Sequence, residues 1–388
     1  MHIFQLCGKT QKDREWMHRR TGNAHTKRPG MHTHRRTGNA HAEEPGTNAR
    51  KDSRVQAGGV SMKIYAYEVR DDEIDYFTQA QKKFDADIIL KPQLLTCGEI
   101  RALEPHSAIS ILGLERCDKD ELDSMAMQDI RYLATRTVGY DHIDLEYAKK
   151  VGIHVCNVGY APDGVADFTI MLMLMCLRNY KQALWRAHVN DFSLNGLMGR
   201  ELSGLTVGIM GTGRIGARVA RDLSGFGCRI LAYNRHPVKE LEDIVTYVTQ
   251  EEIYRQCDII TLHLPLTQET CHMINANTIR KMKDGVVLIN CARGALMDMD
   301  SLIDAVETSK IGALGMDCVE NEEGIIHLDR RTDIFSDRKL AYLRQFKNVV
   351  HTQHMAFYTD GAVRSMVDGA IQGILDMAGN RSCRTQLV

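Results

Sequence analysis

Apolar and polar positions follow two different spacings along most of the chain. After Met62 the stretch MKIYAYEV has the alternation of a strand, and residues 72–84 have the wider spacing of a helix. The runs ADIIL, AISIL and RYLATRTVG predict further strands. A helix is predicted over 162–178, and its uncharged run FTIMLMLMCL at 168–177 indicates burial. That run is about half the ~20 residues that span a membrane.

From residue 205 onward, strands and helical segments alternate. The predicted strands are TVGIM, RILAY, DIITLHL, GVVLINC, IGALGMD and NVVHT, with helical segments such as SLIDAVET between them. Strands that alternate with helices indicate an α/β fold with a parallel, doubly wound sheet and right-handed crossovers. A last helix, over 361–377, is expected to pack beyond this sheet, back on the first domain.

The first 61 residues have a different composition. They contain HRRTGNAH twice, at 18–25 and 34–41, and carry 12 lysines and arginines against five aspartates and glutamates. The remaining residues carry 37 against 45. Apolar residues are too few there to offset the entropy lost on ordering, so 1–61 is expected to be a disordered basic extension. Aromatic residues for base stacking are nearly absent, and we expect no nucleic-acid partner.

The eleven cysteines are scattered without a CxxC pair, and Cys156, Cys176 and Cys291 lie in apolar runs. This distribution favours buried, reduced thiols over a disulfide framework or a metal site. The amino-terminal residues lack the apolar stretch of a signal peptide, and no run is long enough to cross a bilayer. A cytoplasmic protein without membrane contact is the expectation.

The segment LTVGIMGTGRIGARVA, residues 205–220, combines a strand, a glycine-rich turn and a helix. Gly211 would make the tight turn, Gly213 would let the backbone approach a pyrophosphate, and Gly216 would let the helix pack on the strand. The helix amino terminus offers unpaired N–H groups and partial positive charge. The segment therefore predicts a dinucleotide-binding turn.

Cofactor choice is left open by the residue after the next strand. NAD-specific sites of this kind place an acidic residue there to bind the ribose hydroxyls. Here the place is taken by Asn234, followed by Arg235 and His236. A neutral residue beside cations would tolerate a ribose phosphate, although Asn and Arg are also ordinary turn residues. NAD and NADP are both compatible with this pattern.

Three side chains that could perform chemistry follow predicted strands beyond the glycine turn. Arg293 follows GVVLINC, Glu322 follows IGALGMD, and His354 follows NVVHT. Ligands in such sheets bind at the carboxyl ends of the strands, so these side chains could converge. A cation, a proton donor and a carboxylate that keeps the donor protonated are what reduction of a 2-oxo acid requires.

Seven segments together carry a family resemblance that covers about five-sixths of the chain, from about Met62 to the end. They are RTVGYDHID at 136–144, VGYAPDGVADF at 158–168, GTGRIG at 211–216, HLPLT at 263–267, NCARGALMD at 290–298, MDCVENEEG at 316–324 and HMAFYT at 354–359. The sequence resembles the D-isomer-specific 2-hydroxy acid dehydrogenases, most closely their D-lactate dehydrogenase branch. The resemblance implies two Rossmann-like domains. Residues 62–162 and 356–388 would form the substrate (catalytic) domain, and 163–355 the dinucleotide-binding domain.

The resemblance also implies roles for individual residues. Arg293 would bind the substrate carboxylate and carbonyl, Glu322 would pair with the catalytic histidine, and His354, selected over His351, would be the acid/base. The implied substrate contacts are Val138, Gly139, Tyr160, Arg293 and Phe357. The implied cofactor contacts, besides the three glycines and the Asn234 position, are Arg214, Ile215, Leu264, Pro265, Thr270, Ala292 and Asp317.

The expected activity is therefore reversible hydride transfer between NAD(P)H and a small 2-oxo acid. The aromatic pair after His354 favours pyruvate, giving D-lactate. A dehydrogenase for longer-chain hydroxy acids or phosphoglycerate remains an alternative, as does a nicotinamide-sensing corepressor or a binding protein of the same fold. A homodimer is expected because the family usually forms one.

Overall fold

The computed structural model describes residues 56–57 and 60–388, all within the compact unit Asp52–Val388. Most of the predicted disordered extension, 1–61, lies outside the described residues. At its end β1 (Gln56–Ala57) pairs antiparallel with β2 (Val60–Ser61), where disorder was expected. The sequence between them is Gly-Gly, which favours a two-residue hairpin turn.

The first sheet contains five parallel strands in the order β4-β3-β5-β6-β7. The strands are β3 (Lys63–Ala66), β4 (Asp87–Leu90), β5 (Ala108–Ile111), β6 (Tyr132–Thr135) and β7 (His154–Cys156). The helical elements between them are η2 (Asp71–Glu73), α1 (Ile74–Phe84), α2 (Cys97–Arg101), α3 (Lys119–Met127) and α4 (Leu145–Val151). The strand order reverses beside β3, as in doubly wound sheets.

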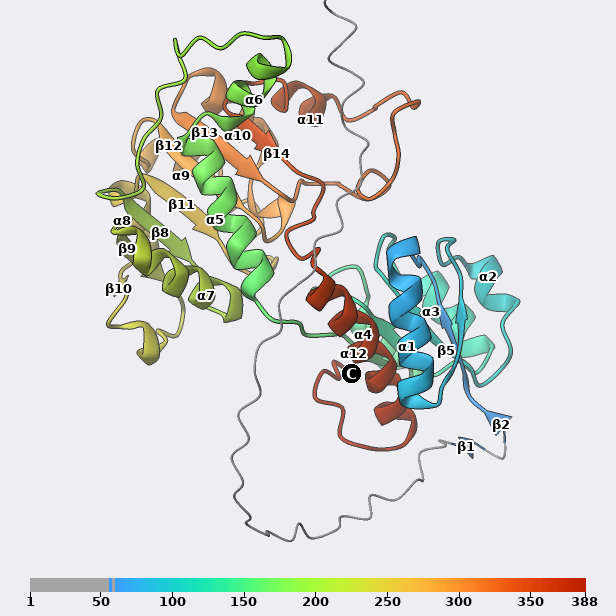
Figure 1. Cartoon of the computed structure of the whole chain (residues 1–388). Helices are drawn as coiled ribbons and strands as arrows, with labels where there is room; N and C mark the ends of the chain where they lie inside the picture. The colour runs from blue at the N-terminus through green and yellow to red at the C-terminus, as the bar shows by residue number, and fades with distance from the viewer. Residues whose placement is uncertain (1–55, 58–59) are drawn as a thin grey trace, which may run out of the picture. The chain divides into compact units, whose positions relative to one another are not determined.

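The second sheet has seven parallel strands in the order β10-β9-β8-β11-β12-β13-β14. Its strands are β8 (Thr206–Met210), β9 (Arg229–Tyr233), β10 (Thr246–Tyr247), β11 (Ile259–Leu262), β12 (Val286–Asn290), β13 (Ile311–Met316) and β14 (Val349–His351). Its helices are α5 (Asp163–Leu177), α6 (Tyr180–His188), α7 (Arg214–Leu223), α8 (Gln250–Gln256), α9 (Ala276–Lys281), α10 (Met299–Glu307) and α11 (Arg338–Leu343). Short turns are η3 (Ser224–Phe226), η4 (Lys239–Leu241) and η5 (Gly294–Leu296). Two parallel α/β sheets confirm the predicted fold class (Figure 1).

Helix α5 follows the first sheet in the chain and covers one face of the second. It contacts α7, β12 and β13, and Leu172, Met173 and Cys176 are buried in the core that it shares with them. The predicted buried helix is therefore confirmed. Among residues 56–57 and 60–388, no helix is both long enough and apolar enough to cross a membrane.

The last helix, α12 (Asp360–Ala378), returns to the first sheet, as the sequence predicted. It contacts α1, β6 and β7, and Figure 1 shows it beside α1. Val367 and Ile371 are fully buried in a cluster with Ile64 and Phe77. The chain thus leaves the first sheet after β7 and comes back after β14.

Strand β6 ends at Thr135, earlier than the run RYLATRTVG predicts, and a buried arginine follows it. The side chain of Arg136 is fully buried, and its Nε donates to Glu73 Oε1 at 3.2 Å. Its Nη1 donates to the carbonyl oxygen of Ser110 at 3.2 Å and its Nη2 to that of Tyr67 at 2.8 Å. One guanidinium therefore joins the ends of β3, β5 and β6 and fixes the loop that begins at residue 137.

Candidate active site

The glycine turn has the geometry that a pyrophosphate requires. Gly211 has φ +96°, and a Cβ there would lie 2.4 Å from the His263 carbonyl oxygen. A Cβ on Gly216 would lie 1.9 Å from the Gly211 carbonyl oxygen, so neither position accepts a side chain. A Cβ on Gly213, which precedes α7, would meet no atom within 4 Å. This open side of the turn, beside the N–H groups that begin α7, fits a dinucleotide phosphate.

Asn234 directly follows β9, at the position the sequence predicted. Its Oδ1 accepts a hydrogen bond from the Thr212 amide at 3.3 Å, and its Nδ2 donates to the His236 carbonyl oxygen at 2.7 Å. The side chain therefore joins the glycine turn to the loop after β9. The neighbouring Arg235 forms an exposed ion pair with Glu269 at 3.1 Å.

Of the other predicted cofactor contacts, several follow β11, Ala292 follows β12, and Arg214 begins α7. Thr270 Oγ1 donates to the Pro265 carbonyl oxygen at 2.7 Å and accepts from the Thr267 amide, which closes the loop after β11. Leu264 lies against Gly211, since a Cβ on that glycine would be 2.9 Å from its side chain. Ala292 follows β12, with its amide bonded to Asn290 Oδ1 at 3.0 Å. Arg214 Nη2 donates to the Tyr160 carbonyl oxygen at 2.8 Å.

Two of the three candidate catalytic side chains are in direct contact. His354 Nδ1 and Glu322 Oε1 are 2.5 Å apart, and both side chains are partly buried. Burial alone would lower the pKa of His354, but its contacts with Cys318 and Glu322 outweigh burial and raise it. Because burial raises the pKa of Cys318, its sulfur stays a thiol near neutral pH. The negative charge that stabilises a protonated His354 ring is therefore that of Glu322.

The carboxylate of Glu322 is itself held in the charged form. Burial opposes its ionisation, but the hydrogen bond and charge of His354, together with the Val319 amide, lower its pKa. That amide donates to Glu322 Oε2 at 3.0 Å. The pair therefore consists of a carboxylate and an imidazolium at neutral pH.

Asp317 organises the loop that carries His354. The carboxylate is fully buried, and its Oδ1 accepts from Thr352 Oγ1 at 2.6 Å and from the Met355 amide at 2.9 Å. Its Oδ2 accepts from the Ala356 amide at 2.7 Å. The histidine backbone has φ +52°, a left-handed conformation that these bonds support. Sequence reasoning assigned Asp317 to the cofactor and missed this set of hydrogen bonds.

The third candidate, Arg293, follows β12 and is bonded to the loop after β6. Its Nε donates to Asp141 Oδ1 at 2.9 Å, and its Nη1 donates to the Ala292 carbonyl oxygen at 2.8 Å. The charge of Glu322 is one of those that raise its pKa against the effect of burial, Asp141 being the largest. The bond to Asp141 was not predicted from the sequence.

The predicted Val138–Gly139 step lies against this arginine. A Cβ on Gly139 would be 1.3 Å from Arg293 Nη2, so the guanidinium fills the space beside the glycine. The carbonyl oxygens of Val138 and Gly139 accept bonds of 2.6 Å from Asn157 Nδ2 and Thr137 Oγ1. Among the described residues, their two amides have no hydrogen-bond acceptor. A cation and two free N–H groups can bind a carboxylate.

Two aromatic side chains predicted for the substrate pocket are neighbours. The ring centroids of Tyr160 and Phe357 are 6.5 Å apart, and the Phe357 ring is 6.5 Å from that of His354. Burial raises the pKa of Tyr160 to about 12.

Sequence reasoning missed His327, whose Nε2 lies 3.2 Å from the His354 carbonyl oxygen. His327 belongs to an irregular segment with no periodic pattern that could have indicated it.

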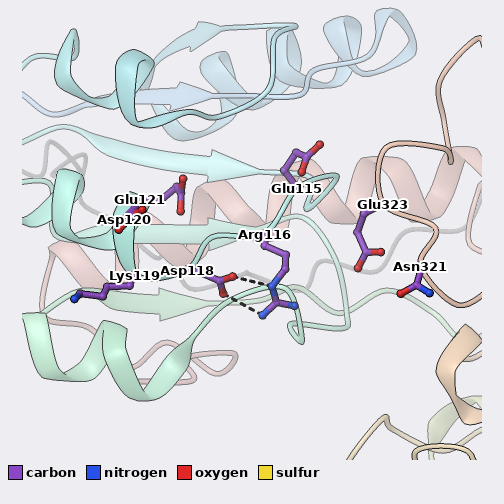
Figure 2. A pocket seen from close by; sticks show the side chains of 8 residues that line it. All are labelled: Glu115, Arg116, Asp118, Lys119, Asp120, Glu121, Asn321 and Glu323. Atoms are coloured by element: carbon purple, nitrogen blue, oxygen red, sulfur yellow. Dashed lines mark hydrogen bonds and ion pairs between the residues drawn. The ribbon is translucent and has the colours of Figure 1, made fainter.

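A separate hollow of about 640 Å³ lies beside this group and includes none of its members. Its lining residues are Glu115, Arg116, Asp118, Lys119, Asp120, Glu121, Asn321 and Glu323. Figure 2 shows Arg116 reaching toward Asp118, with which it forms two hydrogen bonds. The lining of this hollow is mainly acidic, whereas the candidate active site contains the cation Arg293.

Comparisons with known proteins agree with this architecture. The profile of "D-isomer specific 2-hydroxyacid dehydrogenase, NAD binding domain" matches residues 170–356. An aromatic 2-oxoacid reductase of Clostridium sporogenes is 41% identical over 329 residues, which are 84% of this chain and 99% of that protein. The D-lactate dehydrogenase of Escherichia coli is 33% identical over 84% of this chain and 100% of its own.

A solved structure is also similar to this chain. The NAD-complexed D-isomer-specific 2-hydroxyacid dehydrogenase of Lactobacillus delbrueckii ssp. bulgaricus aligns with a TM-score of 0.72 at 30% identity, covering 84% of this chain and 100% of that one. These matches identify a nicotinamide-dependent oxidoreductase that acts on CH–OH groups. The chain belongs to the D-isomer-specific 2-hydroxyacid dehydrogenase family.

Proposed function

We propose that this protein reversibly reduces a small 2-oxo acid to the D-2-hydroxy acid, with pyruvate as the favoured substrate. The observation that carries the proposal is the Glu322–His354 contact of 2.5 Å, which keeps an imidazolium available near the cation at residue 293. A reduced nicotinamide dinucleotide, whose phosphates the glycine turn would hold, would supply the hydride. The residues of this chain supply the proton, the orientation of the substrate and the charge for its carboxylate.

His354 acts as the acid in the direction of reduction. Its Nδ1 is engaged by Glu322, so the transferable proton is carried by Nε2 and passes to the oxygen of the 2-oxo group. In the reverse direction the neutral imidazole accepts the proton of the hydroxyl group at the same atom. Glu322 stabilises the imidazolium through its charge.

Arg293 and the Val138–Gly139 amides bind the substrate carboxylate. Arg293 Nη2 lies against Gly139, and the two amides of the step are available as donors. Nearby, Tyr160 and Phe357 provide an apolar wall for the substrate side chain. This arrangement would place the carbonyl group toward His354, whose ring also contacts Phe357.

A 2-oxo acid with an aromatic side chain is a second candidate. The relative that is 41% identical over nearly its whole length is an aromatic 2-oxoacid reductase, whereas the D-lactate dehydrogenase is 33% identical. Both substrates share the 2-oxo carboxylate that Arg293 would bind. They differ only in the group that would rest on the aromatic wall.

A rate panel tests the proposed function. Pyruvate, 2-oxoisocaproate and phenylpyruvate would each be supplied with NADH and with NADPH, and nicotinamide oxidation followed by absorbance. We expect turnover of at least one acid, with the D-hydroxy acid as product. Absence of turnover with every acid and both cofactors would indicate a binding protein instead. A higher kcat/KM for phenylpyruvate than for pyruvate would move the assignment to the aromatic substrate.

We infer that either NAD or NADP can bind, and that residue 234 sets the preference. Replacing Asn234 with aspartate adds a carboxylate that can accept bonds from ribose hydroxyls and repels a ribose phosphate. The ratio of kcat/KM for NADH to that for NADPH should rise by at least about tenfold, which corresponds to about 1.4 kcal/mol. Asn277→Asp adds the same charge on exposed α9 and serves as the control. An unchanged ratio in Asn234→Asp would remove residue 234 from cofactor selection.

We propose that two copies of the chain form a dimer through α6 and the segment after it. Large apolar side chains are exposed there, namely Tyr180, Leu184, Trp185, Val189, Phe192, Leu194 and Met198. Apolar surface of this kind is typical of subunit interfaces. Light scattering should give about twice the chain mass of 43.8 kDa, and Trp185→Glu with Phe192→Glu should give single chains. Met127→Glu, at another exposed apolar position, is the control, and a monomeric wild type would contradict the proposal.

A further inference from the structure

The guanidinium of Arg293 has three nitrogens, and two of them are already engaged. Nε donates to Asp141 Oδ1 at 2.9 Å, and Nη1 donates to the carbonyl oxygen of Ala292 at 2.8 Å. The described residues provide no acceptor for Nη2. Of the three nitrogens, Nη2 is therefore the one with both of its protons available to a ligand.

The position of this free nitrogen is narrowly defined. Nη2 would be 1.3 Å from a Cβ on Gly139, so it lies in the space that any other residue would fill. The same hypothetical Cβ would be 3.2 Å from Asp141 Oδ1. Gly139, Asp141 and Arg293 thus pack as one group, with Nη2 directed at the Val138–Gly139 step.

Asp141 is held in the ionised form that accepts this bond. Burial opposes ionisation, but the charge and hydrogen bond of Arg293 lower the pKa of Asp141. Its main chain is also fixed, because the Asp141 carbonyl oxygen accepts from Arg116 Nη1 at 3.3 Å. Burial lowers the pKa of the next residue, His142, to about 4, so that ring is neutral and does not compete for the carboxylate.

We propose that Asp141 is a positioning residue for Arg293: it holds Nε so that Nη2 faces the Val138–Gly139 amides and completes the binding site for the substrate carboxylate. The proposal rests on the proposed reduction of a 2-oxo acid. Because Asp141 follows β6 and Arg293 follows β12, the bond also connects the loops of the two sheets. The bond therefore sets the orientation of the guanidinium before a substrate arrives.

Two substitutions at position 141 distinguish the effect of orienting the Arg293 guanidinium from the effect of the negative charge of Asp141. In Asp141→Ala the acceptor for Nε is lost and only the bond from Nη1 to the Ala292 carbonyl oxygen still holds the guanidinium, so KM for the 2-oxo acid should rise at least about tenfold. In Asp141→Asn the amide oxygen still accepts from Nε, and KM should return to within about threefold of wild type. The dissociation constant for NADH, measured by fluorescence without substrate, should stay unchanged in both variants. Asp129→Asn, which removes the carboxylate partner of Arg131, is the matched control.

Gly139→Ala tests the same geometry with Asp141 intact. Its Cβ displaces Nη2, so KM should rise as it does in Asp141→Ala. A wild-type KM in Asp141→Ala or in Gly139→Ala would overturn the positioning role, as would an equal rise in Asp141→Ala and Asp141→Asn. A wild-type protein without turnover on any 2-oxo acid would instead refute the proposed function.

Discussion

Replacing His354 with asparagine should lower kcat for 2-oxo acid reduction by about 10²- to 10⁴-fold, the contribution of a positioned general acid. Asparagine is the conservative choice because His354 has φ +52°, and asparagine adopts this left-handed conformation more readily than most residues. The Asp317 bonds to the amides of Met355 and Ala356 do not involve the imidazole and should persist. The loss should therefore lie in the proton transfer and not in the fold of the loop.

The measurement is steady-state kcat with the best acid of the panel, accompanied by the NADH dissociation constant and the melting temperature. The matched control is His351→Asn, three residues earlier, because His351 lies in the same segment and its Nε2 has no hydrogen-bond partner among the described residues. We expect that control to keep kcat within a few fold. A His354→Asn protein that binds NADH normally and retains a tenth or more of wild-type kcat would show that another group donates the proton.

Replacing Glu322 with glutamine should shift the pH dependence of reduction. The contacts with Cys318 and with the Glu322 carboxylate raise the pKa of His354 above its ordinary value, so the protonated acid persists to higher pH in the wild type. Reduction is lost as pH rises through that raised pKa. Without the charge of Glu322 the pKa falls, and the alkaline limb of the kcat profile moves to lower pH. At an alkaline pH between the limb of the wild type and the limb of Glu322→Gln, kcat of the variant should be at least about tenfold below that of the wild type.

For oxidation of the D-hydroxy acid, the same substitution should have the opposite effect on the pH range of activity. That direction needs neutral His354, so Glu322→Gln should extend oxidation to lower pH while it narrows the range of reduction. The matched control is Glu320→Gln, since Glu320 is two residues away and pairs with His272 at 2.7 Å instead of with His354. If neither the pH profile of reduction nor that of oxidation shifts in Glu322→Gln, the role of this carboxylate is contradicted.

The sequence was sufficient for the features that depend on local pattern. The strand, glycine turn and helix at 205–220 were predicted because a tight turn followed by close packing requires Gly211 and Gly216, and the structure shows both constraints. The placement of Arg293, Glu322 and His354 after strands follows from the same logic. The contact between Glu322 and His354 joins residues that follow two different strands, and the family resemblance supplied it.

Contacts between distant segments were not predictable in the same way. Asp141 and Arg293 are 152 residues apart, and nothing in the local sequence of either one indicates the other. Asp317 follows its strand like many loop residues, and its role depends on three donors from 352–356. Arg136 lay within a predicted strand, yet it follows the end of β6, and its guanidinium binds Glu73 and three carbonyl oxygens. Long-range bonds of polar side chains are not visible in the apolar pattern at such positions.

The chain passes between the two sheets twice, at residues 157–162 and 352–359, and Tyr160 and Phe357 lie one on each passage. Two covalent connections therefore join the two sheets, and the rings of Tyr160 and Phe357, with centroids 6.5 Å apart, pack one connection against the other. A substrate side chain that rests on these rings would contact both connections at once, so the range of accepted acids would depend on how the connections pack as well as on the volume of the pocket.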